Sequence, residues 1–589
     1  MVEATQSAKN LDAQVTADFK YDEQGMLAAH KVTVHSCFLC DRFGVDLNRY
    51  VMSDDYSSNG PYERLEASDV AAKRRRIRLL GLINISLCIV LTLVAVVLLG
   101  TLIPRIWYHH RLWPYSDSPC SGPSSYCPIV LISMDGFRHD YLELVRARYG
   151  PGALPNFARF QQGGVRAMRS INAYPTITLP NHHTLVTGIN PESHGVVANN
   201  VRDTKFPNTV FQMNNQTSLN EAPWVKDWPE PIWVTLQRTG RLAGSLLWPL
   251  TDGPVQGDLP FMQVSQFTLV NQPMARYAYT KRVSDLLWWL HNPRFRLDLI
   301  LAYFDEPDET GHAFGPESEE VAQRVVELDT VLGLLMDGLA KEGLQDQVDI
   351  ILTADHGMAA TNKSRVIPLD QYVDPNWYSY TQLSTMGFLY PSPGKLEDVY
   401  QKLHGANEHM RVYRSKDVPA DLHFSISSSR MPPLVVIPDD GWYLVHREGT
   451  IPSAGDHGYP MNFTDMNPFF LAHGPSFLIN KTIPEVHAVD IYSLLTGLLG
   501  LPAQPNNGSM ARIAHALLKP DVAETVLHTP VWFPRWWAWF MLQLHMVWIF
   551  IGVALWAVLL GMVLSLFYAQ RRHIRMLAIY DTTWNGVTA

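Results

Sequence analysis

Two stretches of the chain are apolar over an unusual length. They span 79–103 and 541–568, and neither contains an Asp, Glu, Lys or Arg residue. At a rise of about 1.5 Å per residue, each stretch is long enough to cross a hydrocarbon core of about 30 Å as a helix. Buried helices of globular proteins are seldom apolar on all sides over such a length. The pattern therefore predicts two transmembrane helices.

The charges that flank these stretches predict their orientation. Basic residues cluster before the first stretch and after the second: Lys73, Arg74, Arg75, Arg76 and Arg78, then Arg571, Arg572 and Arg575. Because such residues favour the cytoplasmic side, we expect a disordered cytoplasmic tail at 1–72 and a second cytoplasmic tail at 569–589. The region between faces the lumen or exterior in this prediction, and it holds five glycosylation sequons: Asn215, Asn362, Asn462, Asn480 and Asn507. The expected protein is an integral membrane glycoprotein.

The central region, 128–520, has a different pattern. Compact apolar runs at 128–134, 297–304 and 348–353 are typical of strands buried on both faces. Between the last two runs, apolar residues recur at spacings of three and four and indicate an amphipathic crossover helix: Val321, Val325, Leu328, Leu332, Leu335 and Leu339. The alternation predicts an α/β domain, with a mainly parallel sheet and helices on both faces.

Charge and cysteine usage narrow the class of protein. The net charge is -9 and 17% of residues are charged, which lacks the basic excess of a protein that binds duplex nucleic acid. Five cysteines are too few for a disulfide scaffold. Cys120 and Cys127 lie on the predicted oxidising side and are expected to form a small-loop disulfide, whereas Cys37 and Cys40 are expected to stay reduced. The oligomeric state and the membrane involved stay open.

Each predicted strand of the central region ends at a carboxylate. Asp135 follows the first strand, Asp305 and Asp308 follow the second, and Asp355 follows the third. Ligands of open parallel sheets bind beyond the carboxyl ends of the strands. Three histidines accompany these carboxylates in EPDETGH, ADHGM and GDHGY, namely His312, His356 and His457. Nitrogen and oxygen ligands of this kind suit two zinc ions that clamp a phosphoryl group.

A nucleophile is predicted in the segment YPTITLPNHHTLVTG at 174–188. Thr178 precedes Leu-Pro-Asn, where a helix is expected to begin, so backbone N–H groups there would face a phosphate. The pKa of a hydroxyl is too high for unaided attack, and coordination to zinc would supply the alkoxide. Alone, such a threonine is more often a strand or cap residue. The neighbouring motifs favour the catalytic interpretation.

Taken together, the motifs resemble the nucleotide pyrophosphatase/phosphodiesterase family of the alkaline phosphatase superfamily, over roughly 128–515. The resemblance is carried by an ordered set of segments: SMDGFR, YPTITLPNH, TGINPESHG, EPIWVT, WPLTD, EPDETGH, TADHGM, GDHGY and FFLAHGPSF. It implies an alkaline-phosphatase-like fold. It also implies two zinc sites. One zinc would be bound by Asp135, Asp355, His356 and the Thr178 oxygen, and the other by Asp308, His312 and His457. Asn199 would hold a phosphate oxygen.

The chain departs from the family pattern beside the nucleophile. Leu179 stands where nucleotide-cleaving members have an aromatic residue, Ile177 precedes the nucleophile, and Pro460 follows GDHGY. The segment 200–233 is rich in aromatic residues and is interpreted as an insertion that forms a rim over the site.

Three functions are therefore considered. The first is hydrolysis of nucleotide phosphodiester or pyrophosphate bonds through phospho-Thr178, which releases nucleoside 5'-monophosphates. The second keeps the chemistry and takes a choline-phosphate or other lipid diester, which a membrane tether and an apolar flank would suit. The third is an inactive receptor or scaffold, which the presence of every predicted ligand disfavours.

Overall fold

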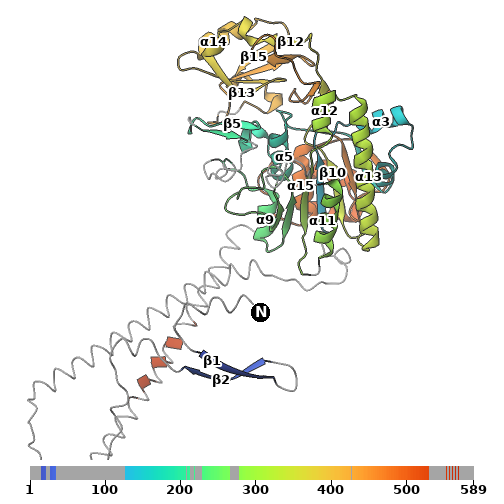
Figure 1. Ribbon diagram of the computed structural model, residues 1–589, viewed down its shortest axis with the longest axis vertical. Coiled ribbons are helices and arrows are strands. Elements are labelled where there is room, and N and C mark those ends of the chain that lie inside the picture. The colour runs from blue at the N-terminus through green and yellow to red at the C-terminus, as the bar shows by residue number, and fades with distance from the viewer. Residues whose placement is uncertain are drawn as a thin grey trace, which may run out of the picture. The chain divides into compact units, whose positions relative to one another are not determined.

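The computed structural model describes the chain in several parts. These are 15–21 and 27–34, then 127–528 except 207–208, 213–217, 219–223, 225–227, 266–277, 293 and 426–427, and scattered positions between 552 and 568 (Figure 1). The chain divides into two compact units, Met1–Val96 and Val97–Ala589. In the first unit, strands β1 (Val15–Tyr21) and β2 (Leu27–Val34) pair antiparallel within the segment predicted to be a disordered tail.

An eight-stranded sheet forms the centre of the second unit. Its strand order is β20-β4-β19-β10-β3-β9-β7-β8. The bounds are β3 (Ile129–Met134), β4 (Gly164–Ile171), β7 (Ala243–Leu246), β8 (Met262–Val264), β9 (Leu299–Phe304), β10 (Asp349–Thr353), β19 (Phe470–His473) and β20 (Lys481–His487). All pairs are parallel except those of β19, which runs antiparallel to both β10 and β4. The predicted mainly parallel α/β sheet is confirmed as a mixed sheet with one reversed strand.

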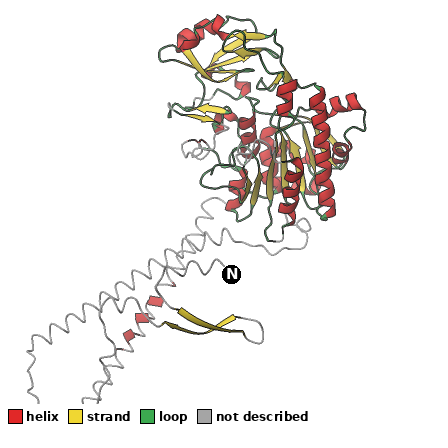
Figure 2. Cartoon of the chain, in the orientation of Figure 1, coloured by secondary structure: helices red, strands yellow, loops and turns green. Residues whose placement is uncertain are grey.

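Helices cover both faces of this sheet (Figure 2). Alternate residues of a buried strand enter opposite cores: Ile129 and Leu131 pack in one hydrophobic cluster, and Val130 and Ile132 in the other. The first cluster lies under α5 (Thr178–Thr187), α9 (Ile232–Arg238), α15 (Ala488–Leu498), α16 (Met510–Leu517) and α17 (Pro520–His528). The second lies under α3 (Tyr141–Tyr149), α4 (Pro155–Gln162), α11 (Tyr279–His291) and α13 (Glu319–Lys341). Because both faces are buried, the central strands β3, β9 and β10 are largely apolar.

Helix α13 is the crossover helix that the spacing predicted. The Ser318 side chain caps it by accepting a hydrogen bond from the Val321 backbone N–H. All six apolar positions that predicted its inner face are buried: Val321, Val325, Leu328, Leu332, Leu335 and Leu339. The helix carries the chain from β9 to β10, on either side of β3.

A smaller sheet between β10 and β19 in the sequence was not predicted. Its four antiparallel strands have the order β13-β14-β16-β15, with bounds β13 (Tyr378–Leu383), β14 (Gly387–Pro391), β15 (Met410–Arg414) and β16 (Leu434–Pro438). Helix α14 (Leu396–Leu403) packs on it around a separate hydrophobic cluster. Two short pairs flank this part in the sequence, between it and strands β10 and β19: β12 (Val366–Pro368) with β17 (Tyr443–Val445), and β11 (Ala359–Ala360) with β18 (Gly455–Asp456).

The prediction of two transmembrane helices is corrected. Among the residues that the structure describes, no helix combines the length and the apolar character needed to cross a membrane. Helix α13 has 23 residues but carries charges along its length, and the apolar helix α15 has only 11 residues. The segments 79–103 and 541–568 lie outside the described residues apart from scattered positions in the second. The predicted integral membrane protein, with a lumenal or extracellular domain and cytoplasmic termini, rested on those helices and is withdrawn with them.

Candidate active site

The predicted ligands converge at the carboxyl ends of the central strands. Asp135 directly follows β3, and its backbone N–H donates to the carbonyl of Phe304 at the end of β9. Asp308 begins α12 (Asp308–Phe314), just past β9, and its N–H donates to the Asp135 carbonyl. Asp355 follows β10 in the sheet position next to β3. The carboxylates that were predicted from the ends of apolar runs therefore meet at one edge.

The first predicted metal group surrounds the His356 ring. His356 Nε2 lies 3.0 Å from Asp355 Oδ2, 3.3 Å from Asp135 Oδ1 and 3.5 Å from Thr178 Oγ1. All four residues are buried. The structure therefore brings together the whole predicted set for one ion, with the hydroxyl of Thr178 on its border.

The second predicted group is contiguous with the first. His457 Nε2 lies 3.1 Å from His312 Nε2 and 3.5 Å from Asp308 Oδ1, and His312 Nε2 lies 3.4 Å from Asp308 Oδ2. Two sets of residues have ligand atoms that all lie within 4.8 Å of one another: Asp308, His312 and His457, and Asp135, Asp308 and His356. Asp308 belongs to both sets, so its carboxylate stands between the two groups.

The hydrogen bonds of the three histidines leave the inward nitrogen free for a metal. Each Nδ1 lies next to a backbone carbonyl. The distances are 2.9 Å from His356 Nδ1 to Gly357, 2.9 Å from His312 Nδ1 to Gly455, and 3.0 Å from His457 Nδ1 to Thr176. A carbonyl only accepts, so each Nδ1 carries a proton and each Nε2 faces the cluster, where a neutral ring would present its lone pair to a metal. Three buried carboxylate oxygens in the cluster have no hydrogen-bond partner: Asp135 Oδ1, Asp308 Oδ1 and Asp355 Oδ2. This donor set fits bound cations.

Electrostatics favours a cation at the same place. Burial and the neighbouring Asp355 and Asp308 raise the pKa of Asp135 well above its usual range. Burial alone would lower the pKa of His356, but the carboxylates of Asp355 and Asp308 raise it to about 9. Burial, together with His356 and His312, lowers the pKa of His457 well below its usual range. Charges crowded in this way are compensated by bound cations.

Thr178 is the first residue of α5, and Ile177 before it is extended. The Leu179 backbone N–H donates to Asn199 Oδ1 at 2.9 Å. The next two residues offer no backbone N–H to a phosphate. Pro180 has no N–H, and the N–H of Asn181 donates to the Ile177 carbonyl. The expected cradle of helix N–H groups is therefore largely replaced by Asn199, whose Nδ2 is left to donate.

The residues that flank the nucleophile are buried in the hydrophobic core. The side chains of Ile177 and Leu179 are each only 1% exposed and belong to the hydrophobic core. Phe211, Trp224 and Trp228 of the 200–233 segment are buried and Phe206 is half-buried, with ring centroids 5.8 Å apart for Phe211 and Trp224 and 6.0 Å apart for Phe211 and Trp228. The buried rings belong to the first hydrophobic cluster. That this segment forms a rim over the site stays a prediction.

A close approach explains the glycine after Asp135. Gly136 has φ of +66°, in the region that other residues rarely adopt. A Cβ there would lie 2.9 Å from both Cβ and Oδ1 of Asp308. Only glycine therefore lets the two carboxylate-bearing loops approach this closely.

Comparison with known proteins agrees with this geometry. The family of type I phosphodiesterases and nucleotide pyrophosphatases matches residues 129–460. The chain belongs to this family. Human ectonucleotide pyrophosphatase/phosphodiesterase family member 5 is 33% identical over 389 residues, which cover 66% of this chain and 78% of the relative. A bis(5'-adenosyl)-triphosphatase of Xenopus laevis is 34% identical over 404 residues, which cover 67% and 84% respectively.

A solved structure extends the comparison. Murine family member 5, as an inactive threonine-to-alanine variant in complex with AMP, has a TM-score of 0.61 and 34% identity, and the match covers 66% of this chain and all of that one. The members of this phosphodiesterase family are hydrolases, so the chain is identified as a hydrolase with the alkaline-phosphatase-like α/β fold.

Sequence reasoning missed one side chain that touches the phosphodiesterase site. The Tyr303 hydroxyl, near the end of β9, donates to Asp135 Oδ2 at 2.6 Å. This bond holds one oxygen of Asp135 and turns the unpartnered oxygen, Oδ1, toward His356. The sequence does contain a sign of this role, because Tyr303 is a hydroxyl-bearing residue in an otherwise apolar strand that is followed by a carboxylate.

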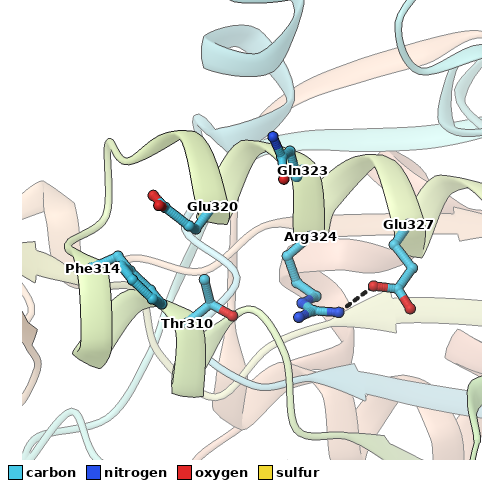
Figure 3. Close-up of a pocket in the computed structure, with 6 residues that line it drawn as sticks. All are labelled: Thr310, Phe314, Glu320, Gln323, Arg324 and Glu327. Atoms are coloured by element: carbon cyan, nitrogen blue, oxygen red, sulfur yellow. Dashed lines mark hydrogen bonds and ion pairs between the residues drawn. The ribbon is translucent and has the colours of Figure 1, made fainter.

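A cavity of about 220 Å³ lies between α12 and α13 (Figure 3). Its lining is Thr310, Phe314, Glu320, Gln323, Arg324 and Glu327. Arg324 forms an ion pair with Glu327, and no predicted metal ligand is among the lining residues. This phosphodiesterase-family site is therefore identified by its converging ligands, not by that cavity.

Proposed function

We propose that the chain is a two-zinc phosphodiesterase that hydrolyses phosphodiester or pyrophosphate bonds of nucleotides, with Thr178 as the nucleophile. The observation that carries this proposal is the convergence of three carboxylates and three imidazole Nε2 atoms beside the Thr178 hydroxyl. Unpartnered buried carboxylate oxygens and inward-facing imidazoles are the features of a metal site, and the adjacent hydroxyl can serve as the nucleophile of covalent catalysis.

The ligand chemistry supports zinc. One ion would be held by Asp135, Asp355, His356 and the Thr178 oxygen, and the other by Asp308, His312 and His457. A mixture of imidazole and carboxylate ligands suits zinc, whereas calcium and magnesium prefer oxygen alone. Bound there, zinc would lower the pKa of the Thr178 hydroxyl and balance the charge on the phosphoryl group.

The reaction has two displacements at phosphorus. Thr178 Oγ1 forms a bond to phosphorus as the bond to the leaving oxygen breaks, and the hydroxyl proton ends on the leaving group. Asn199 would donate from Nδ2 to a phosphoryl oxygen, because Leu179 already fixes its Oδ1. Water then attacks the phospho-Thr178 diester, which restores the hydroxyl and releases the monoester, a nucleoside 5'-monophosphate for a nucleotide substrate.

Nucleotide substrates are favoured over lipid diesters. The Xenopus relative is a bis(5'-adenosyl)-triphosphatase, and the murine relative was solved with AMP. The lipid alternative rested partly on apolar side chains beside the nucleophile, but Ile177 and Leu179 are buried in the core. No described feature of the site favours a lipid.

The test compares full-length wild-type protein with Thr178→Ala and Thr178→Ser, each with zinc added. Substrates are ATP, diadenosine triphosphate, bis(p-nitrophenyl) phosphate and a choline-phosphate lipid. We expect wild type to hydrolyse the nucleotides, Thr178→Ser to retain part of the rate, and Thr178→Ala to lose at least about 10³-fold in kcat. Thr187→Ala, at the other end of α5, is the matched control and should stay active.

Two outcomes would contradict the proposal. A wild-type protein that hydrolyses none of the nucleotides would remove the substrate class. A Thr178→Ala protein with a near-normal rate would instead show direct attack by water and remove the covalent step.

A further inference from the structure

A second histidine of α5 lies behind the nucleophile. His182 follows Thr178 by one helical turn and has no exposed surface. Its Nδ1 is 2.9 Å from the Thr178 carbonyl and 3.4 Å from Asp355 Oδ2. Both of these atoms are acceptors, so Nδ1 carries the ring proton. The Nδ1–H group therefore donates to the backbone carbonyl of Thr178 and also lies close to the carboxylate of Asp355, a predicted metal ligand.

The other ring nitrogen reaches the central sheet. His182 Nε2 lies 2.9 Å from Ser133 Oγ. Ser133 is in β3, two residues before Asp135, and pairs in register with Thr353 of β10, two residues before Asp355. One imidazole thus connects the helix of the nucleophile to the two neighbouring strands that present Asp135 and Asp355.

Aromatic packing fixes the orientation of this ring. Trp248 and Tyr303 meet it edge to face, with centroids 5.1 Å and 5.3 Å away. Trp248 lies between two leucines with positive φ, Leu247 at 62° and Leu250 at 68°. Such backbone angles are unfavourable for leucine and are retained where the surrounding structure requires them. The loop therefore holds Trp248 against His182 in spite of local strain.

We propose that His182 is a positioning residue that sets the placement of the Thr178 hydroxyl relative to the Asp355 metal ligand. Its polar contacts are with the Thr178 carbonyl, with Ser133 and with Asp355, so in this proposal it acts through these groups and touches neither substrate nor metal. The proposal rests on the proposed function, in which Thr178 attacks phosphorus and Asp355 holds a metal. Loss of the ring would slow the chemical step and weaken metal binding, and would leave substrate binding unchanged.

Two amide variants separate the roles of the two nitrogens. In His182→Asn the amide nitrogen occupies roughly the place of Nδ1, and in His182→Gln it lies near the place of Nε2. We expect His182→Asn to keep kcat and zinc affinity within several-fold of wild type. His182→Gln and His182→Leu should each lose on the order of 10- to 100-fold in kcat and in zinc affinity, with KM unchanged.

The measurements use the full chain. Zinc affinity is determined by competition with a chelator in the absence of substrate, so the proposal is tested even if no substrate offered is hydrolysed. His183→Asn is the matched control, because His183 is the next residue of the same helix, is buried, and has no hydrogen-bond partner on either ring nitrogen. It should change neither quantity.

Some results would overturn the proposal. Wild-type kcat and zinc affinity in both His182→Gln and His182→Leu would show that the ring positions nothing. An Asn variant as impaired as the Leu variant would show that the Nδ1 proton is not the important contact, and a rise in KM at constant kcat would place His182 in substrate binding.

Discussion

The rings of His356 and His457 stack face to face, with centroids 3.5 Å apart and planes 11° from parallel. The two residues lie 101 positions apart in the sequence and belong to different predicted metal groups. Each ring is anchored through Nδ1 to a backbone carbonyl, so the stack fixes the spacing of the two groups. Removing one ring should therefore disturb both sites.

We expect His457→Ala to lose the zinc ion of its own group, with Asp308 and His312, and part of the zinc of the other group as well. Wild type should contain about two zinc ions per chain and lose activity on chelation, and the variant should retain less than one. Elemental analysis after dialysis measures the content. His409→Ala removes a comparable ring, stacked on Trp442 at 3.8 Å and directly before β15, and should keep both ions. One full equivalent left in His457→Ala would show that the groups are independent.

Tyr303→Phe should weaken the site without unfolding the protein. The variant keeps the aromatic ring and loses only the hydroxyl that donates to Asp135 Oδ2. We expect kcat and zinc affinity to fall by roughly 10- to 100-fold. Tyr149→Phe, which removes an exposed hydroxyl that donates to Glu319, is the control. Equal kinetics in the two variants would mean that Asp135 needs no orienting partner.

The residues at the carboxyl ends of the strands could be predicted from the sequence, because an Asp that follows a buried parallel strand must lie at that end of the sheet. Asp135, Asp308 and Asp355 were located in this way. The direction of β19 could not be predicted, since a four-residue apolar strand carries no mark of its orientation. The small sheet was missed as well, because strands such as β13 are half exposed and interrupted by a register shift.

The side chain of Leu179 shows a second limit of sequence reasoning. Its position next to the nucleophile suggested contact with substrate, but the helix begins at Thr178, and in this helical phase the next residue faces the core. The predicted membrane helices mark a third limit, because no described helix has the length and apolar character needed to cross a membrane.

Leu179→Phe should therefore destabilise the protein without improving nucleotide binding. The side chain is 1% exposed, and additional volume in a packed core costs about 1–3 kcal/mol. We expect a Tm lower by several degrees and an unchanged KM for ATP. Leu179→Met conserves volume and should stay near wild type. A lower KM in the Phe variant at unchanged Tm would show that position 179 does reach the substrate.

Asp349 should make stability depend on pH. Burial raises its folded pKa to about 6 from an ordinary value of 3.8, despite hydrogen bonds from the backbone N–H and hydroxyl of Ser476. Because the folded pKa is the higher one, the contribution to stability is present below pH 4 and is lost as the pH rises through about 6.

Asp349→Asn removes this loss, because the amide stays neutral and can keep one bond to each Ser476 group. Between pH 4 and pH 7 the free energy of unfolding of the variant should gain on wild type by on the order of 3 kcal/mol. Urea unfolding of both proteins at several pH values measures the difference. Parallel pH profiles would show that Asp349 has the same pKa in the folded and unfolded chain.

Strand β4 must wait for its pairing partners while the protein is being synthesised. Strand β4 has only β19 and β20 as neighbours, and both follow it by most of the domain in the sequence. At about 5–20 residues per second, a ribosome that has released β4 needs on the order of half a minute to deliver its partners. Throughout that time both hydrogen-bonding edges of β4 are open to pairing with other chains. A nascent chain cut after residue 460, where the family match ends, would never close them.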